Sequence, residues 1–316
     1  PFIADLDALP FVSSVYKRHL DVEDYFYSIT RYPEVAIVTA RGCPYRCAYC
    51  LWPQTLTGHT YRKRSVTNIA DEFEFIAREL PQVREVFIET DTLTVDEDRS
   101  VALAKELIRR GNKLRFTANS RPDVSYETLH WLKRAGLRLL CVGFESGDQD
   151  VLDAMHRGLK IEQFYAFRDA ARRAGVLVHG CFMAGNQGET EQSLAATLQL
   201  AKDLEPDTAQ FLPLMVYPGT EAYAWAQEQG HLVSDDFRDW LTPEGLHRST
   251  VSRADLPAEE VVRWCDDARR SFYLRPSYLL RKARQIITHP GEAGRILRAA
   301  RVFVKHLFRP SLPSDH

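Results

Sequence analysis

Cysteine is scarce in this sequence, and its few copies are unevenly placed. Only six of the 316 residues are cysteine. Three of them, Cys43, Cys47 and Cys50, fall within eight residues, and the other three are far apart. A disulfide scaffold would spread its cysteines so that they close long loops. The distribution therefore argues against such a scaffold and favours reduced thiols that act as metal ligands.

Long hydrophobic runs and a leader segment are also missing. The longest apolar runs are strand-sized and interrupted by charge, so no segment predicts a membrane-spanning helix. Residues 1–21 carry acids and no apolar stretch ahead of a small-residue cleavage site, which excludes a secretion signal there. The chain begins at Pro1 without an initiator methionine, so we expect a product of processing or of a cut from something longer. With 45% hydrophobic and 27% charged residues, the composition is typical of a globular cytoplasmic protein.

Charge is nearly balanced overall but not along the chain. The net charge is −2, yet residues 263–309 hold 12 basic against 3 acidic residues, leaving 29 basic and 40 acidic residues elsewhere. Within 291–309, apolar residues recur at spacings of three and four with arginine and lysine between them, which predicts a basic amphipathic helix able to contact an anionic membrane. The alternative is an ordinary helix docked on the body with a solvated basic face. The acidic body argues against a nucleic-acid partner.

From residue 34 onward, short β-rich runs alternate with amphipathic helical stretches. The runs at 35–39, 86–88, 114–118, 139–142, 176–183 and 209–214 predict strands, each followed by a helix. Six β-then-α units imply parallel strands joined by helical crossovers. The fold class predicted is α/β, a partial (βα)6 TIM-like barrel, and a doubly wound sheet stays open as an alternative. We expect an N-terminal connector at 1–33, the core at 34–230 and a helical, basic C-terminal region at 231–316.

The unusual residues of the chain come just after these predicted strands. The three clustered cysteines follow the first strand, and Glu89 with Asp91 end the second. Ser120 and Arg121 follow the third, and Gly-rich segments end the fourth and fifth. Because reactive groups of parallel α/β folds sit at the carboxyl ends of the strands, we expect these loops to form the functional rim.

The cysteine loop favours an iron–sulfur cluster over zinc. A structural zinc site wants four protein ligands, usually as two pairs. No second pair follows the Cys43–Cys47–Cys50 spacing, and the nearby His59 stands alone. Three thiolates on a [4Fe–4S] cluster would hold three irons and leave the fourth open to a small molecule.

The spacing Cys-x3-Cys-x2-Cys after the first strand of a six-unit barrel resembles the radical S-adenosylmethionine superfamily, over about residues 35–230. The resemblance implies that S-adenosylmethionine chelates the open iron and that one electron cleaves it to a 5′-deoxyadenosyl radical, which takes a hydrogen atom from substrate. It also implies an electron donor such as flavodoxin or ferredoxin. The cofactor does the difficult chemistry and the protein positions it.

The resemblance also implies roles for further residues. Tyr49 matches the aromatic position near the adenine, and Glu89 and Asp91 match polar groups near the methionine amino group. Ser120 and Arg121 would reach the carboxylate or ribose. The remaining positions assigned to cofactor binding are Glu145, in Gly-Phe-Glu-Ser-Gly, and two glycines of the next turn, Gly185 and Gly188. A proline is usual in the family where Gln187 stands, which makes this turn less rigid. No catalytic residue is identified.

Several of these residues have structural alternatives. Glu89 and Asp91 could cap the helix that follows, and Arg121, before Pro122, could brace a turn. Glu145 between glycines is harder to explain as structure. The three cysteines outside the loop are expected to be structural packing: Cys141, Cys181 and Cys265.

Residues 51–65, with Trp52-Pro53-Gln54 and Arg62-Lys63-Arg64, resemble the cobalamin-associated subfamily that contains hopanoid-tailoring radical proteins and the anaerobic Mg-protoporphyrin cyclase. Residues 9–18 resemble the connector that follows a cobalamin domain in those proteins, but no Asp-x-His-x-x-Gly cobalamin signature occurs here. The resemblance implies a radical enzyme acting on a hydrophobic or lipid-like, hopanoid-type substrate, at the inner face of the membrane if the basic helix binds lipid. The alternatives are a cobalamin-dependent C-methyltransferase and a non-catalytic metal-binding module.

Overall fold

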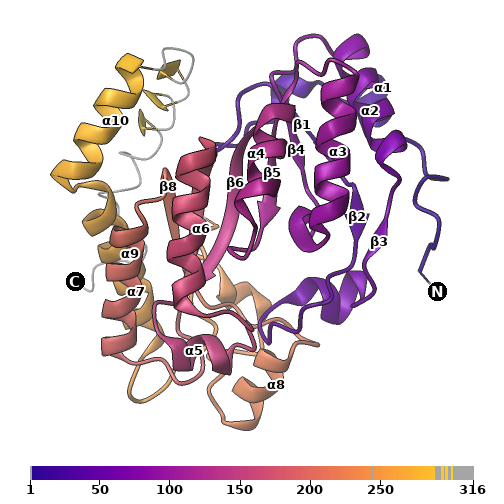
Figure 1. Cartoon of the computed structure of the whole chain (residues 1–316). Helices are drawn as coiled ribbons and strands as arrows, with labels where there is room; N and C mark the ends of the chain where they lie inside the picture. Colours follow the sequence, from indigo (N-terminus) through magenta and orange to yellow (C-terminus); the bar gives the residue numbers. More distant parts are fainter. Residues whose placement is uncertain (1, 243–244, 289–292, 295, 298–299, 302–316) are drawn as a thin grey trace. The chain divides into compact units, whose positions relative to one another are not determined.

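The computed structural model describes residues 2–242, 245–288, 293–294, 296–297 and 300–301. A six-stranded sheet has the order β1-β4-β5-β6-β7-β8 (Figure 1). The strands are β1 (Glu34–Ile37), β4 (Glu85–Ile88), β5 (Arg115–Ser120), β6 (Leu137–Glu145), β7 (Leu177–Ala184) and β8 (Thr208–Pro213). The pairs β1–β4, β4–β5 and β5–β6 are parallel. Each new strand is added at the same edge, whereas a doubly wound sheet reverses its order, so the predicted partial (βα)6 barrel is confirmed.

The helices follow the strands as the periodicity predicts. Those between and after the strands are α2 (Val66–Glu79), α3 (Glu97–Arg109), α4 (Tyr126–Ala135), α5 (Gln149–Ala154), α6 (Ile161–Ala174), α7 (Glu191–Leu204) and α8 (Glu221–Glu228). Ser65 and Ser125 begin α2 and α4 by accepting a hydrogen bond from the backbone N–H three residues on. Gly136, at φ +121, ends α4. These local signals explain why the helix ends can be predicted from the sequence.

Three short elements near the cysteine loop were not predicted. β2 (Ala40–Arg41) and β3 (Arg62–Lys63) form a small antiparallel pair, and a single helical segment, η2 (Trp52–Thr57), lies between them. Two-residue strands are too short to show a periodicity, so sequence patterning does not detect them.

The chain divides into two compact units, which are described separately. The first comprises Pro1–Tyr45, Trp52–Gly143 and Glu162–His179. In it, α1 (Ser13–His19) packs on α2 and β1, and α2, α3 and α4 lie side by side (Figure 1). The rings of Phe73 and Phe116 meet edge to face with centroids 5.9 Å apart, which joins α2 to β5 in the core. The predicted connector therefore contains a helix that packs on the body of this unit.

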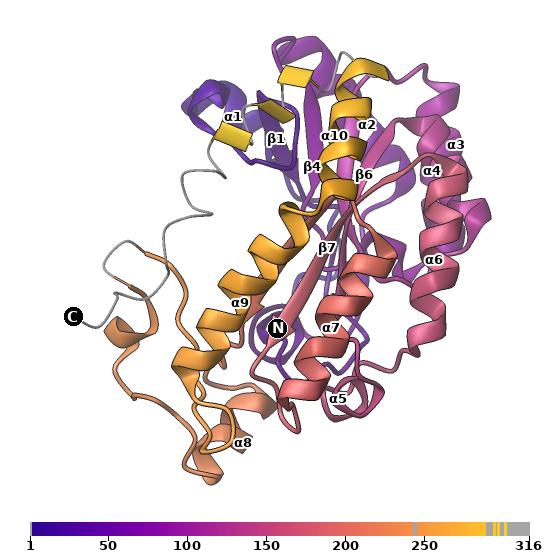
Figure 2. The same ribbon diagram turned by 90° about the vertical axis from the view of Figure 1, so that its left-hand side faces the viewer.

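The second unit comprises Arg46–Leu51, Phe144–Ile161 and Gly180–His316. The helix α9 (Ala258–Tyr273) packs on β8 and α7, and α10 (Pro276–Thr288) follows it (Figure 2). Phe182 stacks on Phe144 at 5.7 Å and on Phe211 at 5.3 Å, so one aromatic column joins β6, β7 and β8. The helix α9 is thus packed on the last strand of the sheet.

The basic segment at 291–309 falls only partly within the described residues. Residues 293–294, 296–297 and 300–301 are helical, as predicted, and the other positions of the segment lie outside the described residues. Within the part of the chain that the structure describes, no helix combines the length and apolarity needed to cross a membrane. The three-part division at residues 33 and 230 stays a prediction.

Candidate functional site

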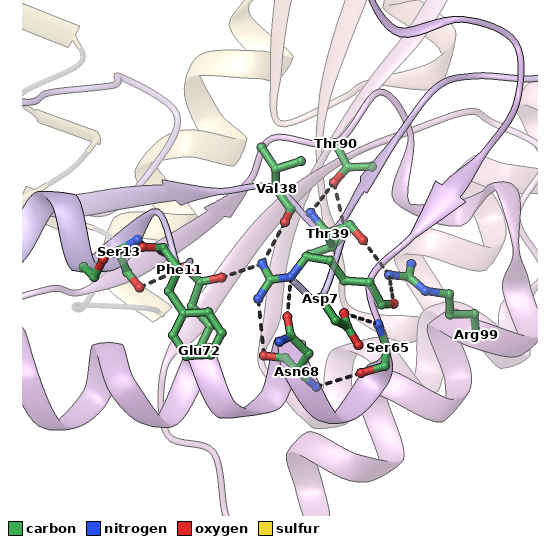
Figure 3. A network of polar contacts seen from close by, with 12 residues as sticks. Asp7, Phe11, Ser13, Val38, Thr39, Ser65, Asn68, Glu72, Thr90 and Arg99 are labelled. Carbon is green, nitrogen blue, oxygen red and sulfur yellow. Dashed lines mark hydrogen bonds and ion pairs between the residues drawn. The ribbon is translucent and has the colours of Figure 1, made fainter. Parts of the chain in front are cut away.

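A buried polar network fixes the backbone where β1 leads toward the cysteine loop (Figure 3). Arg64 donates to the Val38 carbonyl at 2.8 Å and to the Glu72 carboxylate at 2.5 Å. Arg99 donates to the Thr39 carbonyl at 2.8 Å, and Thr39 N–H donates to Thr90 Oγ1 at 3.0 Å. Two arginines thus bind two successive carbonyls just before the loop, which restricts the direction in which the chain leaves the sheet.

The N-terminal segment completes this network. Glu72 on α2 is fully buried and also accepts hydrogen bonds from Ser13, from the backbone N–H at 3.1 Å and from Oγ at 2.8 Å. The Arg64 guanidinium lies over the Phe11 ring at 5.5 Å, and Ser65 N–H donates to Asp7 at 2.8 Å (Figure 3). A buried carboxylate is costly unless it is paired and hydrogen-bonded, so the connector supplies donors that the core of this unit requires.

The start of the cysteine loop is held by Asp91. Gly42 has φ +91, and a Cβ there would lie 2.2 Å from the Thr60 carbonyl oxygen, so no other residue fits. Asp91 Oδ2 accepts from Gly42 N–H and from Thr57 Oγ1, each at 3.0 Å, and Cys43 N–H donates to the Gly58 carbonyl at 3.1 Å. The side chain that caps α3 is Asp96. Asp91 is therefore a support of the cysteine loop rather than a helix cap.

Glu89, the other acidic residue at the end of β4, is exposed and caps no described helix. Partial burial of its carboxyl raises its pKa, although a hydrogen bond from Asn119 and the charge of Arg41 act in the opposite direction. A carboxyl in this setting is available to bind a cationic group.

Ser120 and Arg121 lie together at the end of β5 and are both buried. Ser120 Oγ is 2.9 Å from Thr94 Oγ1. Arg121 pairs with Asp123 at 3.2 Å, and its guanidinium also lies 3.7 Å from the centroid of the Tyr45 ring in the cysteine loop. Arg121 thus braces its turn, as the structural alternative expects, and contacts the loop as well.

In the second unit, Glu145 forms a cluster with three other side chains. Glu145 is buried and has φ +67, an uncommon conformation for a residue other than glycine. Tyr49 donates to Glu145 Oε1 at 3.1 Å, Arg157 Nη2 lies 3.7 Å from the same oxygen, and Arg157 Nη1 donates to Cys47 Sγ at 3.5 Å. A guanidinium thus bridges a carboxylate and a cysteine sulfur. Backbone held in a rare conformation together with buried charges is characteristic of functional sites.

The electrostatics of this cluster follow from its burial. Burial raises the pKa of Tyr49 well above its ordinary value, even though Arg157 acts to lower it. Burial alone would lower the pKa of Arg157, but its interactions with Tyr49, Glu145 and Cys47 outweigh this effect and raise that pKa. Arg157 therefore stays protonated and Tyr49 stays a neutral hydrogen-bond donor.

Arg157 is the main functional candidate that sequence reasoning missed. It lies between α5 and α6 rather than after a strand, so the strand-end rule does not find it. Its position is set by the loop, because Ala48 N–H donates to the Met155 carbonyl at 3.0 Å. A lone arginine in a polar segment carries no sequence signal of its own.

The turn after β7 is built around the buried carboxylate of Glu189. Glu189 accepts from the N–H groups of Gly185 and Asn186, the latter at 3.0 Å, and its own N–H donates to the Asn186 carbonyl at 3.1 Å. Burial raises the Glu189 pKa to about 7. Gly185 and Gly188 have φ of +99 and +76, which explains both glycines. Gln187 is exposed, so the departure from proline falls on a residue at the surface.

The remaining cysteines differ in exposure. Cys265 is buried, as a packing residue should be, whereas Cys141 and Cys181 are partly exposed. Burial raises the Cys181 pKa to about 12, so its thiol stays protonated. No disulfide joins any of the six cysteines.

The cysteine loop offers a donor set that suits an iron–sulfur cluster. Cys47 is buried and Cys43 and Cys50 are partly exposed. Among the described residues, no three His, Cys, Asp or Glu side chains converge on a single metal ion. A cubane instead takes each thiolate at a separate iron. The three sulfur donors and the buried Arg157 cation beside Cys47 fit a negatively charged cluster. The nearby His59 is engaged elsewhere, with its Nδ1 3.2 Å from the carbonyl oxygen of Cys43.

Comparison with known proteins supports this interpretation. A family model described as the radical SAM superfamily matches residues 37–201. An uncharacterised methyltransferase of Pyrococcus horikoshii is 26% identical over 92% of this chain and 61% of its own length. The anaerobic magnesium-protoporphyrin IX monomethyl ester cyclase of Cereibacter sphaeroides is 26% identical over 65% of this chain and 34% of its own length. The chain thus spans less than two thirds of either curated relative.

A solved structure shares the fold. The radical S-adenosylmethionine methyltransferase TsrM of Kitasatospora setae superposes with a TM-score of 0.63 at 21% identity, covering 74% of this chain and 51% of that one. The superfamily is one of enzymes that use a [4Fe–4S] cluster and S-adenosylmethionine, so the predicted family and cofactors are confirmed. By its barrel, its cysteine spacing and the family model that covers more than half of its length, the chain belongs to the radical SAM superfamily.

Proposed function

We propose that Cys43, Cys47 and Cys50 hold the [4Fe–4S] cluster of a radical SAM enzyme whose substrate is hydrophobic or lipid-like. When bound, the cluster and S-adenosylmethionine supply the electron and the 5′-deoxyadenosyl radical that removes a hydrogen atom from substrate. The observation that carries this proposal is the cysteine loop itself, with Arg157 donating to Cys47 and Asp91 holding the Gly42 amide.

The chain's own residues then have distinct tasks. Arg157 offsets the negative charge at Cys47 and fixes Glu145, and Tyr49 orients the same carboxylate. We assign Glu145 to cofactor binding, with its neighbours presenting it in one geometry. Charge-assisted hydrogen bonds of this kind are the strong ones in a site with little water.

The other predicted cofactor residues are retained in this proposal. Glu89 and Asp91 would bind the amino group of the methionine moiety, and Ser120 and Arg121 its carboxylate or the ribose. Asp91 would do so beside its support of the cysteine loop. Gly188 would let the backbone approach the adenine closely, because the space where its Cβ would lie is open. Gly185 would contribute through the backbone conformation of the same turn.

A hydrophobic substrate is supported by two independent features. The relatives include a cyclase named for a magnesium porphyrin ester, a large and mostly apolar ring. In addition, α10 exposes Leu279, Leu280 and Ile287 next to the basic Arg284. Apolar residues among basic ones suit an anionic membrane surface, so we propose that α10, together with the predicted basic segment 291–309, brings the enzyme to a membrane where such a substrate resides. Within this class we propose a hopanoid-type substrate, because residues 51–65 resemble the subfamily that contains hopanoid-tailoring radical proteins.

A second candidate is cobalamin-dependent C-methylation. A relative that covers most of this chain is named a methyltransferase, and a structural neighbour was solved with cobalamin and a [4Fe–4S] cluster bound. Such an activity would require bound cobalamin in addition to the cluster and S-adenosylmethionine. Radical C-methylation would leave S-adenosylhomocysteine in addition to 5′-deoxyadenosine, whereas hydrogen abstraction alone leaves 5′-deoxyadenosine without S-adenosylhomocysteine.

The test is anaerobic reconstitution with iron and sulfide, followed by reduction with S-adenosylmethionine. We expect an absorption band at about 400 nm, typical of a cubane cluster, and release of 5′-deoxyadenosine. Replacing the three loop cysteines with alanine should abolish both, whereas the control Cys141→Ala should retain the absorption band. Zinc binding without 5′-deoxyadenosine release would refute the proposal in favour of a non-catalytic metal-binding module.

A further inference from the structure

The turn after β7 is held by an arginine from beyond the six βα units. Arg253 Nη1 donates to the Asn186 carbonyl at 2.8 Å, and Nη2 donates to the Glu189 carbonyl. Its side chain is only 9% exposed. The Glu189 carboxylate binds the turn's N–H groups while Arg253 binds its carbonyls, so donors and acceptors of the turn are engaged together.

The same segment holds the chain where it leaves β8. Thr250 N–H donates to the Leu214 carbonyl at 3.2 Å, and Val216 N–H donates to Thr250 Oγ1 at 2.9 Å. Val251 belongs to a buried cluster with Leu214 and Val216, and Tyr49 packs against that cluster. Residues 249–262, called here the C-terminal strap, therefore reach the β7 turn, the β8 exit and the aromatic residue of the cysteine loop.

A third contact of the strap is steric. Gly185 is buried, and a Cβ built on it would lie 3.3 Å from Val261 Cγ1. The start of α9 therefore packs directly on the backbone of the turn. A side chain at position 185 would require Val261 to shift by a few tenths of an ångström and would be strained at φ +99, so the glycine and the strap are matched to each other.

We propose that the C-terminal strap completes the S-adenosylmethionine site, with Arg253 as the positioning residue for the Gly185–Glu189 turn. The proposal rests on the function proposed above, in which this turn receives the adenine. A guanidinium that fixes two carbonyls of the turn orders its peptide planes before the cofactor arrives. Binding then costs less conformational entropy than it would on a loose turn.

Arginine suits this task better than lysine. Its planar fork can reach two carbonyls at once, whereas an ammonium is a single point of charge on a flexible stem. Asp255 fixes the remaining edge of the fork, accepting from Nε at 3.1 Å and from Nη2 at 3.3 Å. Arg253 in turn lowers the pKa of Asp255 through its hydrogen bond and charge, so the pair stays ionised.

The experiment compares Arg253→Met and Arg253→Lys with a matched control, Arg238→Met. Arg238 also pairs with an aspartate two residues away, Asp236, but its side chain is 88% exposed. The affinity of the cluster-loaded protein for S-adenosylmethionine is measured by isothermal titration calorimetry. Iron content and thermal unfolding are measured on the same samples.

We expect the dissociation constant to rise about tenfold in Arg253→Met, the size of one lost hydrogen bond to a charged group, and by less in Arg253→Lys. Iron content should match the wild type, and the KM for S-adenosylmethionine should rise by a larger factor than kcat falls. The control should bind as the wild type does. If Arg253→Met does not fold, Thr250→Val, which removes the hydroxyl that accepts from Val216 N–H, should weaken binding in the same way.

Two results would overturn the proposal, and they are distinguishable. An unchanged dissociation constant in Arg253→Met or in the substitute Thr250→Val, with a wild type that binds, would show that the strap is only structural. A wild type that loads a cluster yet binds no S-adenosylmethionine would remove the proposed function itself, and the role of the strap with it.

Discussion

The carboxyl of Glu34 should make the stability of this protein depend on pH. Glu34 begins β1, pairs in register with Glu85 of β4, and is 9% exposed. Within the described residues its Oε2 has no hydrogen-bond partner. Burial, followed by the negative charges of Glu85 and Glu89, raises its pKa from 4.5 to about 7. Glu85 itself pairs with Arg138 at 2.9 Å, so the cation of this cluster is already engaged.

The direction of the pH effect follows from proton binding. Between pH 4.5 and about 7 the folded protein keeps a proton on Glu34 that the unfolded chain has released. The free energy of unfolding therefore falls as the pH rises through this window, and the loss is complete above it. One pKa unit is worth about 1.4 kcal/mol, which sets an upper limit of about 3.4 kcal/mol for this shift. Screening by nearby solvent reduces the expected effect to about 1–2 kcal/mol.

The assay is urea unfolding of the cluster-free protein and of Glu34→Gln at pH 5 and pH 8. The glutamine variant cannot ionise, so it should be more stable than the wild type by about 1–2 kcal/mol at pH 8. At pH 5 the two proteins should be nearly equal. The control is Glu228→Gln, at an exposed position of α8. Its free energy of unfolding should equal that of the wild type at both pH values. Parallel pH profiles for wild type and Glu34→Gln would refute the reasoning.

Three further substitutions test the supports of the site. Arg157→Met removes the cation beside the buried Glu145, so we expect the free energy of unfolding in urea to fall by about 3–5 kcal/mol. We also expect less iron per chain after reconstitution, and full iron loading would contradict the role of Arg157 beside Cys47. Ser13→Ala removes a hydroxyl donor to the buried Glu72 and should cost about 1.5–3 kcal/mol in the same assay, whereas no change would mean that the connector contributes little. Gly42→Ala should prevent cluster assembly, because its Cβ would meet the Thr60 carbonyl oxygen. Assembly is measured as absorbance at about 400 nm. In the control Gly111→Ala, φ is also positive but no atom lies where the Cβ would be, so the cluster should assemble normally.

Local signals made much of the fold predictable. The helices α4 and α6, Tyr126–Ala135 and Ile161–Ala174, follow local signals, because each has a clear apolar stripe and a glycine at or just after its end. The strands were found from short apolar runs, and their true ends differ by up to three residues. The β2–β3 pair was missed, since its register is set by the loop between the two strands and not by any pattern within them.

The candidate site could be predicted only where topology places residues. The cysteines, Glu89, Asp91, Ser120, Arg121 and Glu145 were proposed because they lie at strand ends, and these assignments remain predictions. Arg157 and Arg253 were missed since one follows a short helix and the other lies 64 residues from a turn that it binds. Burial turns such arginines into parts of the site, and burial of a charge is a property of the folded chain rather than of the sequence around it.

The sequence separation within the C-terminal strap has a consequence for how the protein is made. Synthesis delivers the N-terminus first, so Ser13 is present when Glu72 emerges from the ribosome. Arg253 follows the turn that it binds by more than sixty residues, so that turn waits for its last partner until the nascent chain is almost finished. We therefore expect a ribosome-stalled chain that ends before residue 249 to display a cleavable loop at 185–189, which protects itself from protease only once translation passes the strap.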